Sequence, residues 1–198
     1  MSKAEIWEER YAASPQLWSD TPNAFLPELA SSWAPAKALD IGCGEGADAL
    51  WLAENGWQIT GIDYSPTAIK RFLAKSAARG LTKFTRGYAG DAKQLLGLTT
   101  TKPAPLHGEK FDLITIFYVH TPDLPQLITQ VSAHLNPGGR IFIATHAFAL
   151  AKHPPEFIPW PAASLLAEIN PTRNYVVELN QRRENKPGQI DDLLILIF

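Results

Sequence analysis

The amino-acid sequence predicts an α/β fold, in which helices cover both faces of a doubly wound, mostly parallel sheet. Short apolar segments that end at glycine alternate with segments of helical spacing from about Pro35 onward, and this alternation is typical of such a sheet. Two strand-like segments close together near the end of the chain predict a hairpin, which makes the sheet mixed at one end. Residues 3–30 combine an amphipathic segment with a turn-rich one and predict an N-terminal helical cap.

Composition limits the kinds of function. The chain has 198 residues, of which 45% are hydrophobic, enough to form one compact core. A net charge of −2 provides no strong basic field for nucleic acid or an acidic membrane surface, and no apolar segment approaches the roughly 20 residues that a bilayer span needs. The first residues lack the apolar core of a signal peptide, and the single cysteine forms no internal disulfide. We therefore expect a cytoplasmic protein with neither nucleic-acid nor membrane partners.

The part of the chain that alternates between strands and helices is expected to contain five strands. They are predicted over 36–42, 57–63, 82–89, 111–119 and 140–148. Helices are predicted over 47–55, 65–80, 91–97 and 124–135. Ser65 as N-cap, Pro66 in the first turn and Gly80 at the end are typical boundaries for the second of these helices. The segment "NPGG" predicts a turn into the fifth strand.

The C-terminal part is expected to add a helix and two strands. The helix is predicted over 162–169 and the strands over 173–182 and 191–198, with a turn at 185–189. The last strand is strongly apolar, and an exposed edge strand of that kind would aggregate. We therefore expect the last strand to lie inside the sheet.

The loop between the first strand and its helix reads "DIGCGEG" and carries Gly42, Gly44 and Gly46. In doubly wound sheets ligands bind at the carboxyl ends of strands, where glycines allow close approach and the next helix presents free N–H groups. Asp63 ends the second strand about 20 residues on, where an acceptor for ribose hydroxyls is expected. The pattern therefore indicates a nucleoside-bearing ligand.

Other interpretations of this loop fit less well. A phosphate loop needs Lys and Ser/Thr after the last glycine, where Ala47 and Asp48 stand. The glycine spacing is one residue tighter than the dinucleotide fingerprint, and Asp40 and Glu45, with no arginine nearby in the sequence, would repel a pyrophosphate. A ligand with an ammonium or sulfonium group would not be repelled. Cys43 is interpreted as a small residue in a tight turn, with a nucleophilic role as the alternative.

The loop, Asp63 and "LNPGG" before the fifth strand resemble the class I S-adenosylmethionine-dependent methyltransferases over essentially the whole chain. The opening "WEERYAASPQLWSDTPNAFL" is similar to the cap of the tellurite-resistance and thiopurine methyltransferases. The resemblance implies a Rossmann-like seven-stranded mixed sheet, flanked by helices, whose last strand is antiparallel. We expect a single methyltransferase domain over 1–198, with a cap at 1–34, a cofactor-binding core at 35–150 and a C-terminal helix and hairpin at 151–198.

The resemblance also implies the cofactor S-adenosyl-L-methionine and the residues that bind it. Gly42, Cys43 and Gly44 would cradle its methionine part near Asp40, and Asp63 would accept both ribose hydroxyls. Residues beside the adenine or the methyl group would be Tyr64, Ser65, Asp91, Ala92 and Phe117. Asp91 is equally a candidate helix N-cap.

The candidate substrate residues come from the cap, the end of the fourth strand and the segment after the fifth. A base is needed only where the acceptor must lose a proton, and His120 and His146 are the candidates because they follow the fourth and fifth strands. Arg10 is a candidate partner for a carboxylate of either the cofactor or the substrate. The other candidates are Trp7, Tyr11, Trp18, Asn23, Tyr118, His153, Phe157 and Trp160.

The sequence thus predicts methyl transfer to a small molecule, at oxygen, nitrogen, sulfur or a metalloid. Two alternatives stay open: a cofactor-binding protein of the same fold without catalysis, and an NAD-dependent oxidoreductase. Nucleic-acid methylation is disfavoured because "FYVHTP" follows the fourth strand in place of an N/D-P-P-Y/F motif. We expect no metal site, and a monomer or homodimer.

Overall fold

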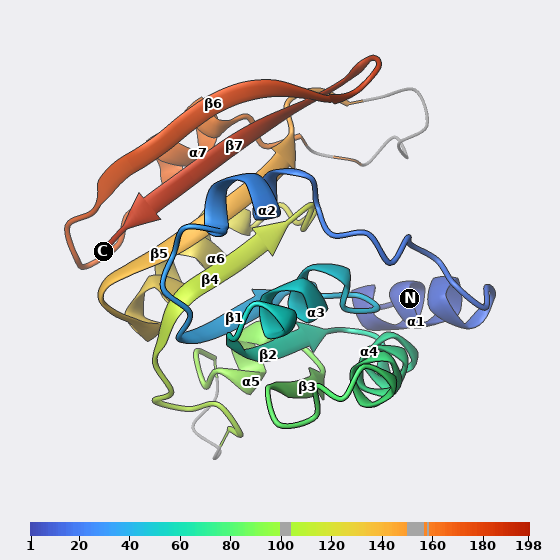
Figure 1. Cartoon of the computed structure of the whole chain (residues 1–198). Coiled ribbons are helices and arrows are strands. Elements are labelled where there is room, and N and C mark those ends of the chain that lie inside the picture. The colour runs from blue at the N-terminus through green and yellow to red at the C-terminus, as the bar shows by residue number, and fades with distance from the viewer. Residues whose placement is uncertain (100–103, 150–156, 158) are drawn as a thin grey trace. The chain divides into compact units, whose positions relative to one another are not determined.

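The computed structural model describes residues 1–99, 104–149, 157 and 159–198. The predicted substrate residue His153 lies outside these described residues. The chain divides into two compact units, Met1–Glu109 and Lys110–Phe198 (Figure 1).

Three parallel strands and the helices that connect them form the centre of the first unit (Figure 1). The strands are β1 (Lys37–Ile41), β2 (Gln58–Asp63) and β3 (Thr85–Ala89). The helices are α3 (Ala47–Glu54), α4 (Pro66–Ala78) and α5 (Ala92–Leu95). The middle strand, β2, pairs in parallel with both β1 and β3. Each element overlaps the segment predicted for it, because alternating apolar segments and caps are local signals.

Helix α4 shows how these local signals operate. Its N-cap Ser65 has an extended backbone, and its hydroxyl accepts a hydrogen bond from the Ala68 N–H at 3.0 Å. Pro66 is the first helical residue, and Gly80 lies just past the end with a φ of +71°. All three predicted boundaries are confirmed.

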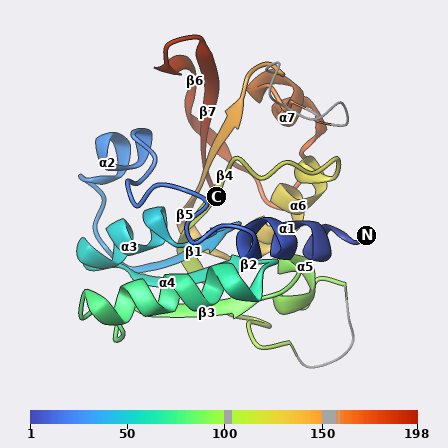
Figure 2. The same ribbon diagram turned by 90° about the vertical axis from the view of Figure 1, so that its right-hand side faces the viewer.

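Two helices form the predicted N-terminal cap, α1 (Lys3–Ala12) and α2 (Phe25–Ala30). A capping box begins α1: the Glu5 N–H donates to the Ser2 hydroxyl, and the Ser2 N–H donates to the Glu5 carboxylate. The helix packs against α4 (Figure 2), and Tyr11 is its buried residue.

The second unit contains four strands and the helices that follow them. The strands are β4 (Phe111–Phe117), β5 (Leu135–His146), β6 (Val176–Lys186) and β7 (Gln189–Ile197). The helices are α6 (Leu124–Val131), the 3-10 helix η1 (Ser132–His134) and α7 (Ala162–Glu168). Strands β4 and β5 are parallel, and β7 is antiparallel to both β5 and β6. The apolar last strand therefore lies inside the sheet, as predicted.

The strand order is β3-β2-β1-β4-β5-β7-β6 in one sheet of seven strands. The predicted mixed sheet with an antiparallel last strand is confirmed. Among the described residues, no helix is both long enough and apolar enough to cross a membrane.

The fifth strand differs from the prediction at its start. The sequence predicts a turn at 136–139, but β5 already begins at Leu135, which pairs with Phe111 of β4. The pairing register shifts between Phe111 and Leu113, and Gly138 has a φ of +78°. The "NPGG" segment is thus an irregular part of the strand, because the positive φ of a glycine is absorbed by a bulge as readily as by a turn.

Candidate functional site

The glycine loop after β1 is held against β2 and leaves little room for side chains. The N–H groups of Gly42 and Cys43 both donate to the carbonyl of Ile62, at 2.8 and 3.0 Å. Gly44 has a φ of +53°, and a Cβ added there would lie 2.7 Å from the hydroxyl oxygen of Tyr11. The backbone therefore forms a bare cradle at the carboxyl end of β1, where a doubly wound sheet binds its ligand.

The carboxylate of Asp63 joins this loop to the start of α4. One of its oxygens accepts the Gly44 N–H at 3.0 Å, and the other accepts the Ser65 N–H at 2.9 Å. Burial raises the pKa of Asp63, although these two N–H groups oppose the shift. A half-buried carboxylate at the carboxyl end of β2, beside a glycine cradle, fits a ligand that carries vicinal hydroxyls.

Tyr64 and Asp91 meet at the carboxyl ends of β2 and β3. The Tyr64 hydroxyl donates to one oxygen of Asp91 at 3.0 Å, while the other oxygen accepts the Lys93 N–H at 2.7 Å. Asp91 is therefore the N-cap of α5 and also the partner of Tyr64, so both interpretations given for it above are compatible with the structure. Ala92, the first residue of α5, is buried.

Glu8 of α1 is a site residue that the sequence analysis missed. Its carboxylate accepts hydrogen bonds from the Ser65 hydroxyl and from the Thr67 N–H, the latter at 3.1 Å. The hydroxyls of Ser65 and Thr67 lower the pKa of Glu8, in that order of importance. Because Ser65 already caps α4 and donates to Glu8, its predicted contact with the adenine stays a prediction. No local pattern pairs residues that stand 57 positions apart.

Cys43 points into the interior of the first unit. A Cβ added at Gly61 of β2 would lie 2.8 Å from its sulfur. Burial raises the pKa of the Cys43 thiol well above its ordinary value, and the charges of Asp40 and Asp63 raise it further. A thiol that stays protonated is a poor nucleophile, which supports the interpretation of Cys43 as a small residue in a turn. Asp40 on β1 is also buried.

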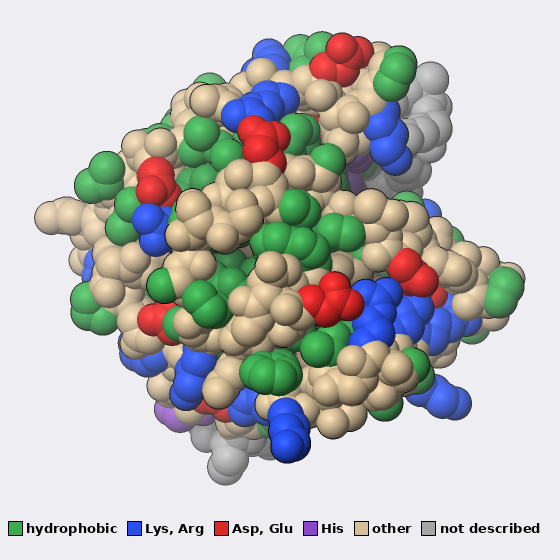
Figure 3. Space-filling view, viewed as in Figure 1, with side chains coloured by type: hydrophobic (Ala, Val, Ile, Leu, Met, Phe, Trp, Pro, Cys, Tyr) green, Lys and Arg blue, Asp and Glu red, His purple; other side chains and the backbone are tan. Residues whose placement is uncertain are grey.

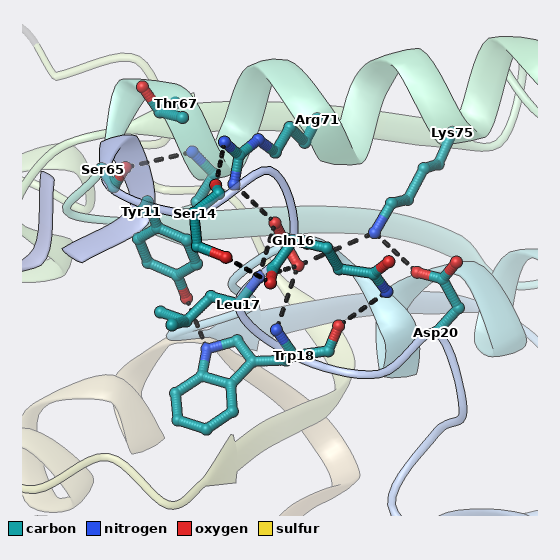
Figure 4. Close-up of polar contacts among 12 residues, drawn as sticks. Tyr11, Ser14, Gln16, Leu17, Trp18, Asp20, Ser65, Thr67, Arg71 and Lys75 are labelled. Carbon is teal, nitrogen blue, oxygen red and sulfur yellow. Dashed lines mark hydrogen bonds and ion pairs between the residues drawn. The ribbon is translucent and has the colours of Figure 1, made fainter.

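Glu45 attaches the loop to the chain that follows α1. Figure 4 shows three of its partners, Leu17, Trp18 and Arg71. Its buried carboxylate accepts the N–H groups of Leu17 and Trp18 at 3.3 Å and the guanidinium of Arg71 at 2.8 Å. The expectation that no arginine lies near the loop acids is therefore wrong for Glu45. Arg71 of α4 balances the charge of Glu45, so the repulsion expected for an anionic ligand rests on the remaining carboxylates alone.

Four predicted residues of the cap gather over the loop. The Trp18 indole N–H donates to the Tyr11 hydroxyl at 3.0 Å. The Trp7 ring centroid lies 6.1 Å from that of Tyr11, and the Arg10 guanidinium stacks 4.5 Å from the Trp7 ring centroid. Burial, followed by the charge of Asp63, raises the pKa of Tyr11. Arg10 is exposed, and its predicted contact with a carboxylate stays a prediction.

Replacing Glu45 with glutamine is expected to loosen this attachment of the cap. The amide would lose its ion pair with Arg71 and weaken two backbone hydrogen bonds, at a cost of about 1–3 kcal/mol, because Arg71 is partly exposed and solvent screens the pair. Hydrogen exchange at the amides of Leu17 and Trp18 should accelerate. Asp20→Asn is the control, since among the described residues the exposed Asp20 carboxylate pairs with Lys75 and not with Arg71. Equal acceleration in both variants would contradict the role given to Glu45.

Asp48 makes stability depend on pH. Burial raises its pKa from 3.8 to about 6, although its carboxylate accepts the Asn23 N–H at 2.6 Å. A carboxyl with a higher pKa in the folded chain binds more protons there, so its contribution to stability is complete below pH 3.8 and is lost as the pH rises through about 6.

Asp48→Asn should keep the hydrogen bond from the Asn23 N–H and remove the loss of stability at higher pH. Between pH 4 and pH 7.5, the free energy of unfolding of the variant should rise by up to about 3 kcal/mol relative to that of the unchanged chain. Urea unfolding at both pH values measures the difference. Glu54→Gln, an exposed carboxyl at the end of α3, should show no such gain. A stability difference for Asp48→Asn that is the same at both pH values would refute the assignment.

The predicted residues of the second unit also gather, at the carboxyl ends of β4 and β5. The His120 ring stacks on His146 with a centroid distance of 5.4 Å, and Phe157 meets His120 at 4.5 Å. The Trp160 indole N–H donates to the carbonyl of Thr121 at 2.9 Å.

Two residues at the end of β4 take different positions. Phe117 is buried, and its ring meets that of Phe142 edge to face, with the centroids 4.8 Å apart. Tyr118 has a φ of +54°, which among the described non-glycine residues is the only positive value. Phe117 therefore serves the core of the second unit, and its predicted contact with the methyl group stays a prediction.

Asp191 of β7 is the second site residue that the sequence analysis missed. One oxygen lies 2.8 Å from Nδ1 of His146, and the other accepts the Tyr118 hydroxyl at 2.7 Å and the Asn185 amide at 3.0 Å. Burial acts to raise the pKa of Asp191, but the bonds from His146, Tyr118, Asn185 and Gln189 together lower it. A signal was present, because a hairpin that places the last strand antiparallel beside the fifth brings Asp191 opposite His146.

The methyltransferase domain family matches residues 7–179 of this chain. The protein therefore belongs to that family, in agreement with the resemblance to methyltransferases. The tellurite-resistance and thiopurine branch stays a prediction.

Individual relatives are distant. The ubiquinone biosynthesis O-methyltransferase of Stutzerimonas stutzeri is 29% identical over 150 residues, which cover 69% of this chain and 60% of that protein. Hemagglutinin 1 of Eikenella corrodens is 28% identical over 123 residues, which cover 60% and 37%. This chain thus spans less than two thirds of either relative. A solved structure concerned with the conversion of a disulfide bond into a thioacetal group during echinomycin biosynthesis has the same fold, with a TM-score of 0.72, 23% identity and coverage of 98% and 92%.

Proposed function

We propose that this chain transfers a methyl group from S-adenosylmethionine to a small-molecule acceptor, acting as one domain over residues 1–198 in the cytoplasm. The observation that carries the proposal is the carboxylate of Asp63, which is held at the end of β2 by the N–H of Gly44 in the glycine cradle. Family membership supports the chemistry, and this geometry supports binding of the nucleoside beside Asp63.

Each residue of the first unit has a proposed task in binding. The loop from Gly42 to Gly44 lies against the methionine part, Asp63 accepts the ribose hydroxyls, and Tyr64 with Asp91 borders the adenine. The carboxylates around the loop favour a cationic ligand, with Glu45 set aside because Arg71 balances it. Tyr11 and Trp18 cover the loop and exclude water. When bound, the cofactor supplies an electrophilic methyl group, so that the protein contributes mainly position and desolvation.

A small acceptor is supported by the aromatic rings around His120 and His146, since aromatic side chains with a few polar groups are a common lining for small ligands. The name of the ubiquinone biosynthesis relative favours an oxygen acceptor. Basic and acidic side chains are interleaved on the face shown in Figure 3, in keeping with the net charge of −2. That mixture favours a small acceptor over nucleic acid.

Thermal unfolding with separate ligands tests the proposal. A ligand at 100 times its dissociation constant adds about 2.7 kcal/mol to the free energy of unfolding. We expect a clear rise in the unfolding temperature with S-adenosylmethionine and with its demethylated product, and none with NAD. A rise with NAD alone would refute the proposal.

A further inference from the structure

We infer that Asp191 positions His146 as the base that removes a proton from the acceptor, and that the acceptor is a small aromatic compound with an ionisable hydroxyl. The inference rests on the proposed function and specifies its substrate class. Three features of the second unit support it: the contact between the two side chains, the hydrogen bonds that hold Asp191, and the position of the pair in the sheet.

The contact fixes which nitrogen of His146 acts. Residues 146 and 191 are directly opposite each other in the antiparallel pair β5–β7, and Nδ1 of His146 lies 2.8 Å from the Asp191 carboxylate. An ionised carboxylate accepts from Nδ1–H and so selects the tautomer in which Nε2 takes up a proton. The same carboxylate then stabilises the imidazolium that forms.

Asp191 is held more firmly than a structural partner of one histidine requires. The residue is fully buried, and its second oxygen receives the Tyr118 hydroxyl at 2.7 Å and the Asn185 amide at 3.0 Å. Tyr118 reaches it from a left-handed backbone conformation, with a φ of +54°. Strain of this kind in a non-glycine residue is concentrated at functional sites, where the surrounding structure maintains it.

The pair lies where a doubly wound sheet binds its ligands. His146 is the last residue of β5, and Tyr118 follows the last residue of the parallel neighbour β4. The His146 side chain retains 12% exposure to solvent, so a ligand has access to it. Among the described residues, the titratable groups that face it are Asp191 from β7, and Tyr118 and His120 from the segment after β4. Aromatic rings from His120 and Phe157 are suited to a planar acceptor.

The proton and the electrons balance without another reactant. As the acceptor oxygen forms its bond to the methyl carbon, the carbon–sulfur bond breaks and its electron pair stays on sulfur. The hydroxyl proton passes to Nε2 of His146, and the imidazolium later returns it to water. The products are an aryl methyl ether and the demethylated thioether.

The test compares phenols that are ionised at the assay pH with phenols that are not. Asp191→Asn should lower kcat/KM by about 10²- to 10⁴-fold for phenols with a pKa near 10, the usual range for loss of a positioned base. Nitrophenols that are already ionised need no base, so their rates should fall less than tenfold. Asp192→Asn, the neighbouring buried carboxyl that pairs with Arg182, should leave both rates within about twofold. The same assay is run with an aniline and with a thiophenol, to test for a nitrogen or a sulfur acceptor.

A second measurement uses the protein alone. The nitrogen NMR spectrum of His146 without any ligand should show the neutral tautomer protonated at Nδ1, and a larger share of the other tautomer in Asp191→Asn, because Nδ1–H loses its carboxylate acceptor. His146→Gln repeats the comparison of phenols in a chain that keeps a side chain beside Asp191, in case Asp191→Asn does not fold.

Three outcomes would overturn the inference: equal losses on ionised and un-ionised phenols, a His146 tautomer that is the same in Asp191→Asn, or methylation of the aniline or the thiophenol alone. A chain that binds S-adenosylmethionine but methylates no phenol would also overturn it while leaving the proposed function intact. A chain that shows no stabilisation by S-adenosylmethionine or its product would instead refute the proposed function.

Discussion

Asp63→Ala is expected to weaken binding of S-adenosylmethionine by about 10²- to 10⁴-fold, while the chain stays folded. Two hydrogen bonds from ribose hydroxyls to an ionised carboxylate contribute about 1.5–3 kcal/mol each, and the alanine variant loses both. It also loses the bond that holds the Gly44 N–H at 3.0 Å, so the glycine cradle is no longer fixed to β2. Most of the thermal stabilisation by the cofactor should therefore disappear.

Isothermal titration with S-adenosylmethionine and with its demethylated product measures this loss, and circular dichroism of the free chain checks folding. Glu54→Ala is the control, because Glu54 is an exposed carboxylate that pairs with Arg79 at 2.9 Å. Wild-type affinity in Asp63→Ala would mean that the nucleoside binds elsewhere, even if the enzyme class is right.

Gly46→Ala is expected to destabilise the chain by about 2–5 kcal/mol. Gly46 has a φ of +86°, and an added Cβ would lie 2.1 Å from the ring of Phe72, which is fully buried on α4. The left-handed backbone costs about 1–2 kcal/mol for a residue with a Cβ, and the overlap with a packed ring adds about 1–3 kcal/mol. Urea unfolding measures the total.

Two further variants separate these causes. Gly80 has a φ of +71°, but a Cβ there would meet nothing within 4 Å, so Gly80→Ala should cost only the backbone term of about 1–2 kcal/mol. Phe72→Leu should make Gly46→Ala less costly, since the smaller side chain leaves room for the methyl group. If Gly46→Ala and Gly80→Ala lower the free energy of unfolding by the same amount, the close approach of Phe72 does not add to the cost of the Gly46 substitution.

The fold was predictable because its signals are local. Ser65, Pro66 and Gly80 mark the ends of α4 within the sequence, and apolar segments that end at glycine mark the buried strands. The start of β5 was not predictable, since a proline and two glycines look the same in a turn and in a bulge. Only the pairing of Leu135 with Phe111 distinguishes them.

The residues of the candidate site were predictable where a single position in the sequence indicates the role. Asp63 follows from its distance along the chain to the glycine loop. Glu8 and Arg71 did not follow from the sequence, because each acts through a partner in another element: Glu8 with Ser65, and Arg71 with Glu45. Asp191 was interpreted only as the start of an apolar strand, and its importance appears once β7 lies beside β5. Charges that pair across elements depend on the fold and have no pattern in the sequence.

The position of β7 also makes the chemistry sensitive to strand register. Side chains alternate between the two faces of a sheet, so a shift of one residue would exchange Asp191 for Ile190 or Asp192 opposite His146 and turn the strand over. An inserted residue between positions 191 and 197 would therefore disturb the core and the base together, whereas one inserted between 187 and 188 would lie outside both strands. We expect the fold to tolerate a longer turn better than a change in the number of residues along β7.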